Sequence, residues 1–348
     1  MAYEPSNSHE LSGRMKRDTI CSTGEMLAKF QRMYLRHNQI LDIEDDLECI
    51  LAFGPPEEGV DRPARTYLLV GDSGAGKSTI LKRFWNQHAV VSEELRERMD
   101  VVYSEVPAAA TRPGTMRAIL TALGVGVSSR ATEADLTRIL VHHLRGMGVR
   151  VLILDEAQHL VDRETGRFAY ATADWFKSLA NSGIALVIAG LPEAALAYEH
   201  NVQLERRSMG SQRLRGFEWD GDDEGDWMTL LRGLVGRLPL ADTSCLLTGD
   251  IPHRLHMVTG GYLGRLVDFL SLVIMEAGKR SLTGVSRELL MTVEERRRDV
   301  QNSDWLNVFA LVSLDGYQPP LRDTSRRTRI RRGARRPRQQ DIEHPEAA

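Results

Sequence analysis

The feature that most constrains this chain is the octapeptide Gly71–Ser78, which reads GDSGAGKS. It fits the pattern G-x-x-x-x-G-K-[ST] at every position, and its flanks have the order that a phosphate-binding loop requires. The apolar and β-branched run from Thr66 to Val70 predicts a buried strand, and Thr79 to Gln87, which lacks Gly and Pro, predicts a helix. This order favours a nucleotide phosphate site over a chance glycine-rich turn.

Each residue of the loop has an expected role at such a site. The backbone N–H groups should turn inward around the phosphates, and the following helix N-terminus adds its partial positive charge. Lys77 should reach the β- and γ-phosphates, and the Ser78 hydroxyl should ligate Mg²⁺. The predicted nucleotide-binding residues are Gly71, Asp72, Ser73, Gly74, Ala75, Gly76, Lys77, Ser78 and Thr79.

A second apolar run, VRVLILDEAQHL at residues 149–160, ends in two adjacent carboxylates. A strand that ends in two acids is costly to bury and suits a Mg²⁺ site. Asp155 is predicted to hold the metal and Glu156 to polarise an attacking water, the two functions that phosphoryl transfer needs beyond the loop. Taken alone, the segment could also be a strand followed by an acidic helix cap. The letters DEAQ are found in helicases as well, but no second set of helicase motifs accompanies them.

Composition sets the broad class of the protein. A chain of 348 residues, 42% hydrophobic and 27% charged, can bury one large core or two smaller ones. We expect no membrane span, because the sequence has neither an apolar N-terminal signal region nor a run of about twenty apolar residues. Three widely separated cysteines predict neither a disulfide framework nor a zinc site, and indicate a reducing cytoplasm.

The charge of the chain is unevenly distributed. Residues 322–338 contain nine arginines and one aspartate, a net +8, which leaves −11 for the rest of a chain whose total is −3. A basic tail on an acidic body is typical of a flexible arm for nucleic acid or another polyanion, although a solvated tail without a partner has the same composition. The tail lacks apolar periodicity, so we expect it to be disordered when unbound.

Hydrophobic periodicity divides the chain into four predicted parts. Strands alternate with helices up to about residue 222, including strands near 101–106 and at IALVIAGLP and a possible fifth at RLRGFEW, which predicts an α/β fold with a parallel sheet. Amphipathic helices then follow to about residue 300. We expect a flexible N-terminus (1–24), a nucleotide-binding core with N-terminal helices (25–222), a small helical lid (223–300) and a C-terminal segment with the basic tail (301–348).

The order of these motifs resembles a known family. The phosphate loop, LILDEAQHL, LVIAGLPEA, QLERR and GGYLGRLVDFL look like an AAA+ ATPase, and more narrowly like the TnsC/TniB transposition regulators of bacterial transposons. The resemblance covers roughly residues 25–285, and its narrower part rests on YLRHNQILDIEDDLECILAFGP, VPAAATRPGTMRAILTALG and DEAQHL. It implies ATP and Mg²⁺ as cofactors, and a ring or helical filament of subunits around duplex DNA. It also implies a transposase and a target-selection protein as partners.

The resemblance also assigns two arginines. Within NVQLERRSMGSQR, Arg207 best matches the arginine finger that reaches a neighbouring subunit's γ-phosphate, with Arg206 and Arg213 as rivals. In TGGYLGRLVDFL, Arg265 matches the lid arginine that senses nucleotide. Either arginine could instead be ordinary surface charge.

One departure from the family pattern affects the expected rate of hydrolysis. The fourth strand of these ATPases often ends in a polar residue that orients water, whereas here it ends in Gly190-Leu191. Slow hydrolysis, a different residue in that role, or a nucleotide that acts mainly as a switch would each fit. Two other classes remain open: a signalling or secretion-associated ATPase that does not bind DNA, and a scaffold that does not hydrolyse ATP. For DNA contacts the sequence offers Arg112, Arg117 and Arg130, each of which could equally be plain surface charge.

Overall fold

The computed structural model describes residues 21–53, 64–88, 99–108, 111–161, 166–199, 202–299, 306–314 and 316–317. The predictions about the basic segment 322–338 and about residues 1–20 lie outside these residues and stay predictions. Among the described residues, no helix by itself has the length and apolar composition to cross a bilayer; α10 (Ile251–Thr259) and α11 (Leu263–Lys279), bent by 114°, pass that test only as a pair, by length and composition alone.

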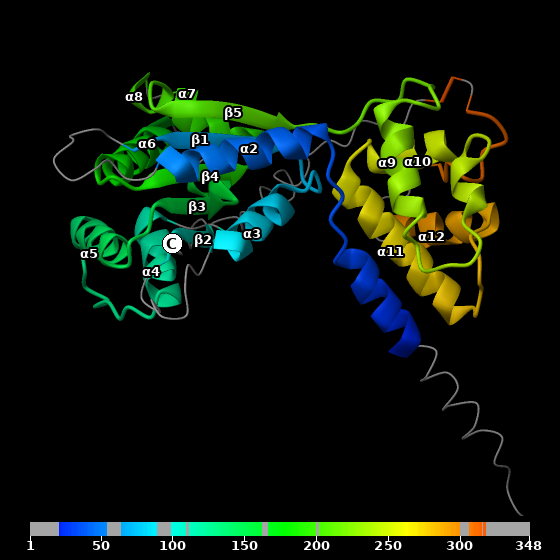
Figure 1. Ribbon diagram of the computed structural model, residues 1–348, viewed down its shortest axis with the longest axis horizontal. Helices are drawn as coiled ribbons and strands as arrows, with labels where there is room; N and C mark the ends of the chain where they lie inside the picture. The colour runs from blue at the N-terminus through cyan, green and yellow to red at the C-terminus, as the bar shows by residue number, and fades with distance from the viewer. Residues whose placement is uncertain are drawn as a thin grey trace, which may run out of the picture.

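A parallel sheet forms the centre of the larger body (Figure 1). Its strands pair in the order β2-β3-β4-β1-β5, and every pairing is parallel. All residues of β3 and β4 are buried, as expected for strands covered by helices on both faces. The strands are β1 (Thr66–Gly71), β2 (Val101–Glu105), β3 (Val151–Asp155), β4 (Ala185–Gly190) and β5 (Ser208–Leu214).

Helices cover both faces of this sheet, which confirms the predicted α/β class. Because side chains alternate along a strand, Leu152 and Leu154 of β3 face one apolar core, formed with α4, α5 and α6, while Val151 and Ile153 face the other, formed with α2 and α3. The helices of this body are α2 (Asn38–Phe53), α3 (Lys77–His88), α4 (Arg112–Ala122), α5 (Glu133–Gly146), α6 (Gly166–Asn181) and the short α7 (Leu196–Glu199) and α8 (Val202–Glu205).

Local sequence signals determine where two of these helices begin. The Thr111 side chain caps α4 by accepting from the Gly114 N–H, and a proline occupies its first turn. Helix α5 starts with a capping box, in which Thr132 and Asp135 each accept from the other's backbone N–H.

The helical lid forms a separate apolar core beside the sheet body (Figure 1). It contains α9 (Asp226–Val235), α10, α11 and α12 (Arg287–Asp299). The helix of residues 21–31 packs here as well: Phe30 is 2% exposed within the lid core, and Gln31 donates to the Ser271 hydroxyl of α11. Its apolar spacing predicts that one face is buried but not against which element, so from sequence this helix is grouped with the nucleotide-binding core.

The fifth strand lies earlier in the chain than expected. The sequence placed it at residues 213–219, whereas β5 runs from Ser208 to Leu214. Most residues of this edge strand are small or polar, so its sequence lacks the apolar alternation that is typical of a strand. Its extended conformation comes from its pairing with β1. The prediction of RLRGFEW as the strand was therefore wrong except at its first two residues.

Candidate nucleotide-binding site

The site forms where parallel strands end at one edge of the sheet. Val70 of β1 lies beside Gly190 of β4, and Leu154 of β3 pairs with Ile188 of the same strand. The phosphate loop, the acidic pair at the end of β3 and the end of β4 therefore meet at the carboxyl edge, where ligands bind in open α/β sheets.

The phosphate loop has the backbone that its sequence requires. Gly74 and Gly76 have φ angles of +80° and +106°, which side chains with a Cβ rarely adopt. At Gly71 an added Cβ would lie 2.7 Å from the Leu214 carbonyl oxygen, so a glycine is also needed for β5 to approach. Helix α3 begins directly at Lys77, which aims its N-terminal N–H groups at the loop.

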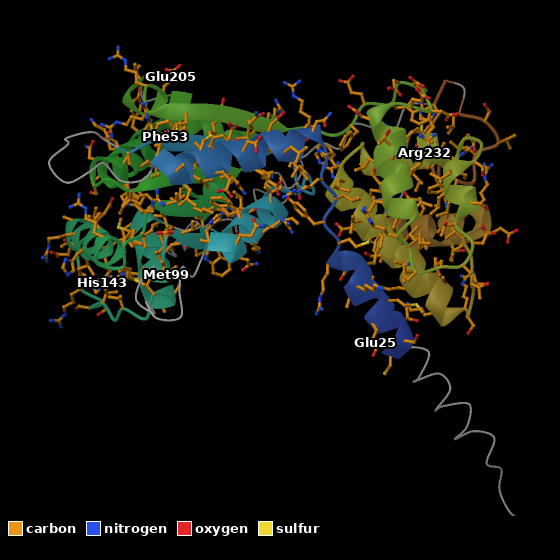
Figure 2. The ribbon with its side chains drawn as sticks, viewed as in Figure 1. Glu25, Phe53, Met99, His143, Glu205 and Arg232 are labelled. Carbon is orange, nitrogen blue, oxygen red and sulfur yellow. The ribbon has the colours of Figure 1, made fainter. Side chains whose placement is uncertain are left out.

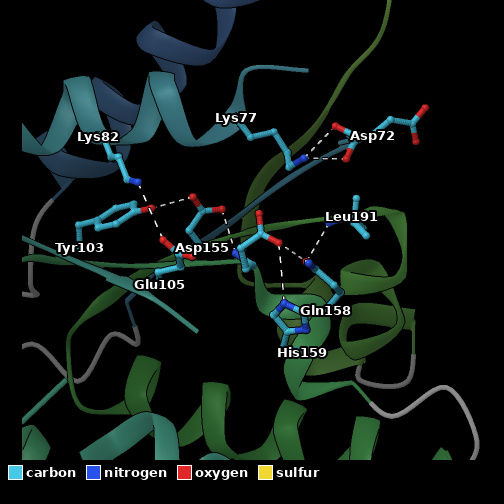
Figure 3. A network of polar contacts seen from close by, with 11 residues as sticks. Asp72, Lys77, Lys82, Tyr103, Glu105, Asp155, Gln158, His159 and Leu191 are labelled. Atoms are coloured by element: carbon cyan, nitrogen blue, oxygen red, sulfur yellow. Dashed lines mark hydrogen bonds and ion pairs between the residues drawn. The ribbon is translucent and has the colours of Figure 1, made fainter. Parts of the chain in front are cut away.

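Lys77 is buried inside this loop. Its ammonium donates to the Gly71 carbonyl at 2.7 Å and to the Asp72 carbonyl at 3.1 Å. Burial lowers the pKa of Lys77, and the carboxylates of Glu156, Asp155 and Asp72 oppose that shift. The predicted cation and the predicted acids are thus close enough to interact across the site (Figure 3).

Asp155 is fully buried at the end of β3 and is held by two hydrogen bonds. The Tyr103 hydroxyl donates to Asp155 Oδ2 at 2.8 Å, and the Glu156 N–H donates to Oδ1 at 2.9 Å (Figure 3). Burial, followed by the charge of Asp155, raises the pKa of Tyr103, so the phenol stays protonated and remains a donor. Tyr103 carries no signal in the sequence, because only the pairing of β2 with β3 brings it to Asp155.

Glu156 has a left-handed backbone, with φ at 57°. Its carboxylate accepts a hydrogen bond from Gln158 Nε2, and His159 Nε2 lies 4.0 Å from Glu156 Oε2 (Figure 3). Non-glycine residues in this region are uncommon, and such positions cluster at functional sites. The turn lifts Glu156 off the line of the strand and leaves its side chain about one third exposed.

The lid contacts the phosphate loop directly. The Tyr262 hydroxyl donates to the Asp72 carboxylate, and Arg265 Nε donates to the Ser73 carbonyl at 2.9 Å. The Arg265 guanidinium also lies over the Tyr262 ring, 4.3 Å from its centroid. The structure thus brings Arg265 to the loop, together with Tyr262, whose position the sequence did not indicate.

A family model described as "Bacterial TniB protein" matches residues 29–217. The chain belongs to the TniB family. It is an AAA+ ATPase, with the phosphate loop, Asp155-Glu156 strand end and helical lid that this class combines. No match was found among curated protein sequences.

Solved structures of similar fold include ORC and CDC6 proteins. CDC6P from Pyrobaculum aerophilum is 17% identical, with a TM-score of 0.55 over 77% of this chain and 70% of its own. The ORC2 protein from Aeropyrum pernix, in its ADP form, is 16% identical, with a TM-score of 0.52 over 75% and 68%. The Aeropyrum pernix ORC1 protein, solved in complex with DNA, is 17% identical, with a TM-score of 0.54 over 76% and 66%. At these identities the likeness shows the fold alone.

In this TniB-family chain the structure places Arg207 away from the other predicted residues. Arg207 precedes β5, and its carbonyl accepts from Thr66 at the start of β1, whereas the phosphate loop follows the end of β1. Five residues of strand span about 16 Å, more than an arginine side chain can reach. Figure 2 labels Glu205, two residues earlier, at the end of the sheet body far from the lid. Arg207 therefore cannot serve its own subunit's phosphates.

The two rival arginines are placed differently. Arg206 is exposed, and Arg213 lies opposite Val70, at the same end of β1 as the loop of its own subunit. Of the three, only Arg213 lies at the end of β1 from which the phosphate loop follows.

Two of the predicted DNA-contact residues make bonds within the chain. Arg117 donates to the carbonyls of Ser128, Ser129 and Ala131, and so holds the loop between α4 and α5. Arg112 forms an ion pair with Glu133 at 2.9 Å. Arg130 is exposed. The side chains of Arg112 and Arg117 thus have a structural role, which the pattern of basic residues could not reveal.

Proposed function

We propose that this protein is an ATP-dependent DNA-binding regulator of DNA transposition. In this account ATP joins subunits into a ring or filament on duplex DNA, and that assembly recruits or activates a transposase at its target. Hydrolysis then releases the assembly. The protein acts in the cytoplasm, with a transposase and a target-selection protein as partners.

The observation that carries this proposal is the lid seated on the phosphate loop of a TniB-family core. Tyr262 and Arg265 both bond to loop residues, so any nucleotide that moves the loop also changes the contacts of the lid. ATP can favour one assembly state only if it binds that state better, and a lid coupled to the loop supplies such a difference. The DNA complex solved for the ORC1 protein lends support at the level of fold.

The residues of the site fit ATP with Mg²⁺. The described residues contain no cluster of three or more His, Cys, Asp or Glu side chains that could hold a metal by itself. Magnesium in nucleotide sites is usually held by one or two protein groups together with the phosphates. Ser78, in the first turn of α3, and Asp155, buried at the end of β3, would hold the ion here, and its positive charge would offset that of the phosphates.

Arg207 is assigned to the neighbouring subunit's site. Its distance from its own phosphate loop and its place at the far end of the sheet body support an action across a seam. At that seam its guanidinium would meet the charge that develops on the γ-phosphate.

DNA binding with and without a non-hydrolysable ATP analogue tests the proposal. Because the contacts are chiefly to phosphates, affinity should fall steeply with salt, vary little with sequence, and rise cooperatively with protein concentration only when the analogue is present. Lys77→Ala removes the main cation for the phosphates and is the matched control. The analogue should not change the DNA binding of this variant.

Deletion of residues 322–348 separates the body from the basic tail. The truncated protein should keep ATP-dependent cooperative binding with a shallower salt slope, because fewer phosphates are neutralised. DNA binding that needs no ATP and disappears with the tail would contradict the assembly. A lack of DNA binding at any salt concentration, with ATP turnover intact, would favour a signalling or secretion-associated ATPase.

A further inference from the structure

The end of β4 has no side chain at Gly190, yet a polar group occupies the space beside it. A Cβ added to Gly190 would lie 2.3 Å from Gln158 Oε1, so the Gln158 side chain fills the volume that a residue at position 190 would otherwise take. Gln158 is only 8% exposed and comes from the 3₁₀ turn Ala157–Leu160, directly after Glu156.

Two hydrogen bonds fix the orientation of the Gln158 amide. The Leu191 N–H donates to Oε1 at 3.0 Å, which requires the oxygen to face β4. The amide nitrogen must then face the opposite way, where it donates to Glu156 Oε2 (Figure 3). An N–H on one side and a carboxylate on the other leave only one assignment of oxygen and nitrogen that satisfies both.

We propose that Gln158 is a positioning residue for ATP hydrolysis that replaces the missing polar side chain at the end of β4. It ties the Glu156 carboxylate to the backbone of β4 and holds it in one orientation beside the phosphate loop. The inference rests on Glu156 as the residue that polarises water, but not on DNA or a transposase as partner.

The chemistry of the amide suits this role. Its nitrogen carries two hydrogens, and the bond to Glu156 uses one of them. The second can meet the attacking water or a phosphate oxygen, which is the interaction that a polar residue at the end of β4 would make. Hydrolysis therefore does not require a side chain at position 190, and the departure from the family pattern at Gly190-Leu191 has a structural explanation.

The Gln158→Glu variant separates positioning from structure. Glutamate has nearly the same shape and keeps an oxygen to accept from the Leu191 N–H, but it sets a carboxylate against Glu156 in place of a donor. Turnover should fall by about tenfold to about 100-fold, the scale of a misplaced general base, while ATP affinity stays within about twofold. Gln87→Glu is the control, because it makes the same chemical change at an exposed position near the end of α3.

A second measurement, thermal stability, tests the shared space without any need for activity. Gly190→Ser should destabilise the parent protein, because its Cβ would overlap Gln158 Oε1. In a Gln158→Ala background that overlap is gone, and the remaining contacts of the added Cβ are 3.1 Å to Ala194 Cβ and 3.2 Å to Ala157 N. Gly190→Ser should therefore lower the thermal stability by less in this background than in the parent protein.

The outcomes are decisive in both directions. Parent-like turnover of Gln158→Glu, or an equal loss in Gln87→Glu, contradicts the positioning role. An equal loss of thermal stability on Gly190→Ser in both backgrounds contradicts the claim that the Gln158 side chain fills the space beside Gly190. Reduced turnover with retained ATP affinity, together with the expected change in the cost of Gly190→Ser, supports the inference even if the protein fails to bind DNA.

Discussion

Gly264→Ala should separate the lid from the phosphate loop without weakening the lid itself. Gly264 is the second residue of α11, where alanine normally stabilises a helix by up to about 1 kcal/mol. Its added Cβ, however, would lie 2.5 Å from the Gly74 carbonyl oxygen and 3.1 Å from the Gly74 carbonyl carbon. Both atoms belong to the backbone of the loop, so rotation of a side chain cannot relieve the overlap.

The structure sets the size of the expected effect. Ordinary contact begins near 3.4 Å, so lid and loop must move apart by about 0.9 Å. Arg265, the next residue, bonds to Ser73 at 2.9 Å and would move with the helix. A displacement of about 1 Å at a catalytic site can cost about 100-fold in rate. We expect ATP turnover to fall by between about tenfold and about 100-fold, with no loss of thermal stability.

Steady-state ATP hydrolysis and binding of a fluorescent ATP analogue measure this effect. Gly146→Ala is the matched control, because Gly146 ends α5 and an added Cβ meets nothing within 4 Å. If Gly264→Ala binds and hydrolyses ATP like the parent protein, close packing of the lid on the loop has no part in the reaction and the reasoning fails.

Three further predictions concern Lys77, Glu156 and His256. Lys77→Ala should abolish tight ATP binding in a filter or fluorescence assay, because the phosphates lose the cation that the loop now holds against the Gly71 and Asp72 carbonyls. Glu156→Gln should keep ATP affinity but slow hydrolysis about 100-fold or more, and equal turnover in both proteins would contradict its role as the base. Stability should fall as the pH drops below 6.5, because burial lowers the pKa of His256 in the folded lid and the unfolded chain then binds a proton that the folded one does not. Urea unfolding between about pH 8 and about pH 5.5 should show this loss, at most about 1.4 kcal/mol per pH unit for this group, and His256→Gln should reduce it.

The parts of the site that could be predicted from sequence are those carried by contiguous residues. The phosphate loop needs glycines, a lysine and a hydroxyl in fixed order, and Asp155-Glu156 end a strand that is recognisable by its apolar run. The parallel sheet followed from the alternation of strands and helices. These signals lie in contiguous residues, so they can be recognised without knowledge of the fold.

The remaining parts depend on which elements become neighbours. Tyr103 meets Asp155 only because β2 pairs with β3, and Gln158 meets Leu191 only because β3 pairs with β4. Tyr262 is 190 residues from Asp72 in sequence. In an isolated sequence each of these residues is an ordinary aromatic or amide side chain. The same reason explains why the helix of residues 21–31 was grouped with the sheet body although it packs on the lid.

Mixing two inactive variants tests the central claim most directly, which is that ATP joins subunits through a shared site. Arg207→Ala should bind ATP but not hydrolyse it, because the neighbour's γ-phosphate loses its cation. Glu156→Gln should hydrolyse ATP slowly, because the attacking water loses the carboxylate that polarises it. In an equal mixture on duplex DNA, a seam can combine an intact Glu156 with an intact Arg207. Random assembly restores about a quarter of such seams in a head-to-tail ring or filament.

The account predicts that steady-state ATP turnover in the mixture rises well above that of either variant alone, toward this fraction of the parent rate. Turnover that stays at the level of the separate variants, although light scattering or crosslinking shows that the two proteins assemble together, would contradict a site shared between subunits.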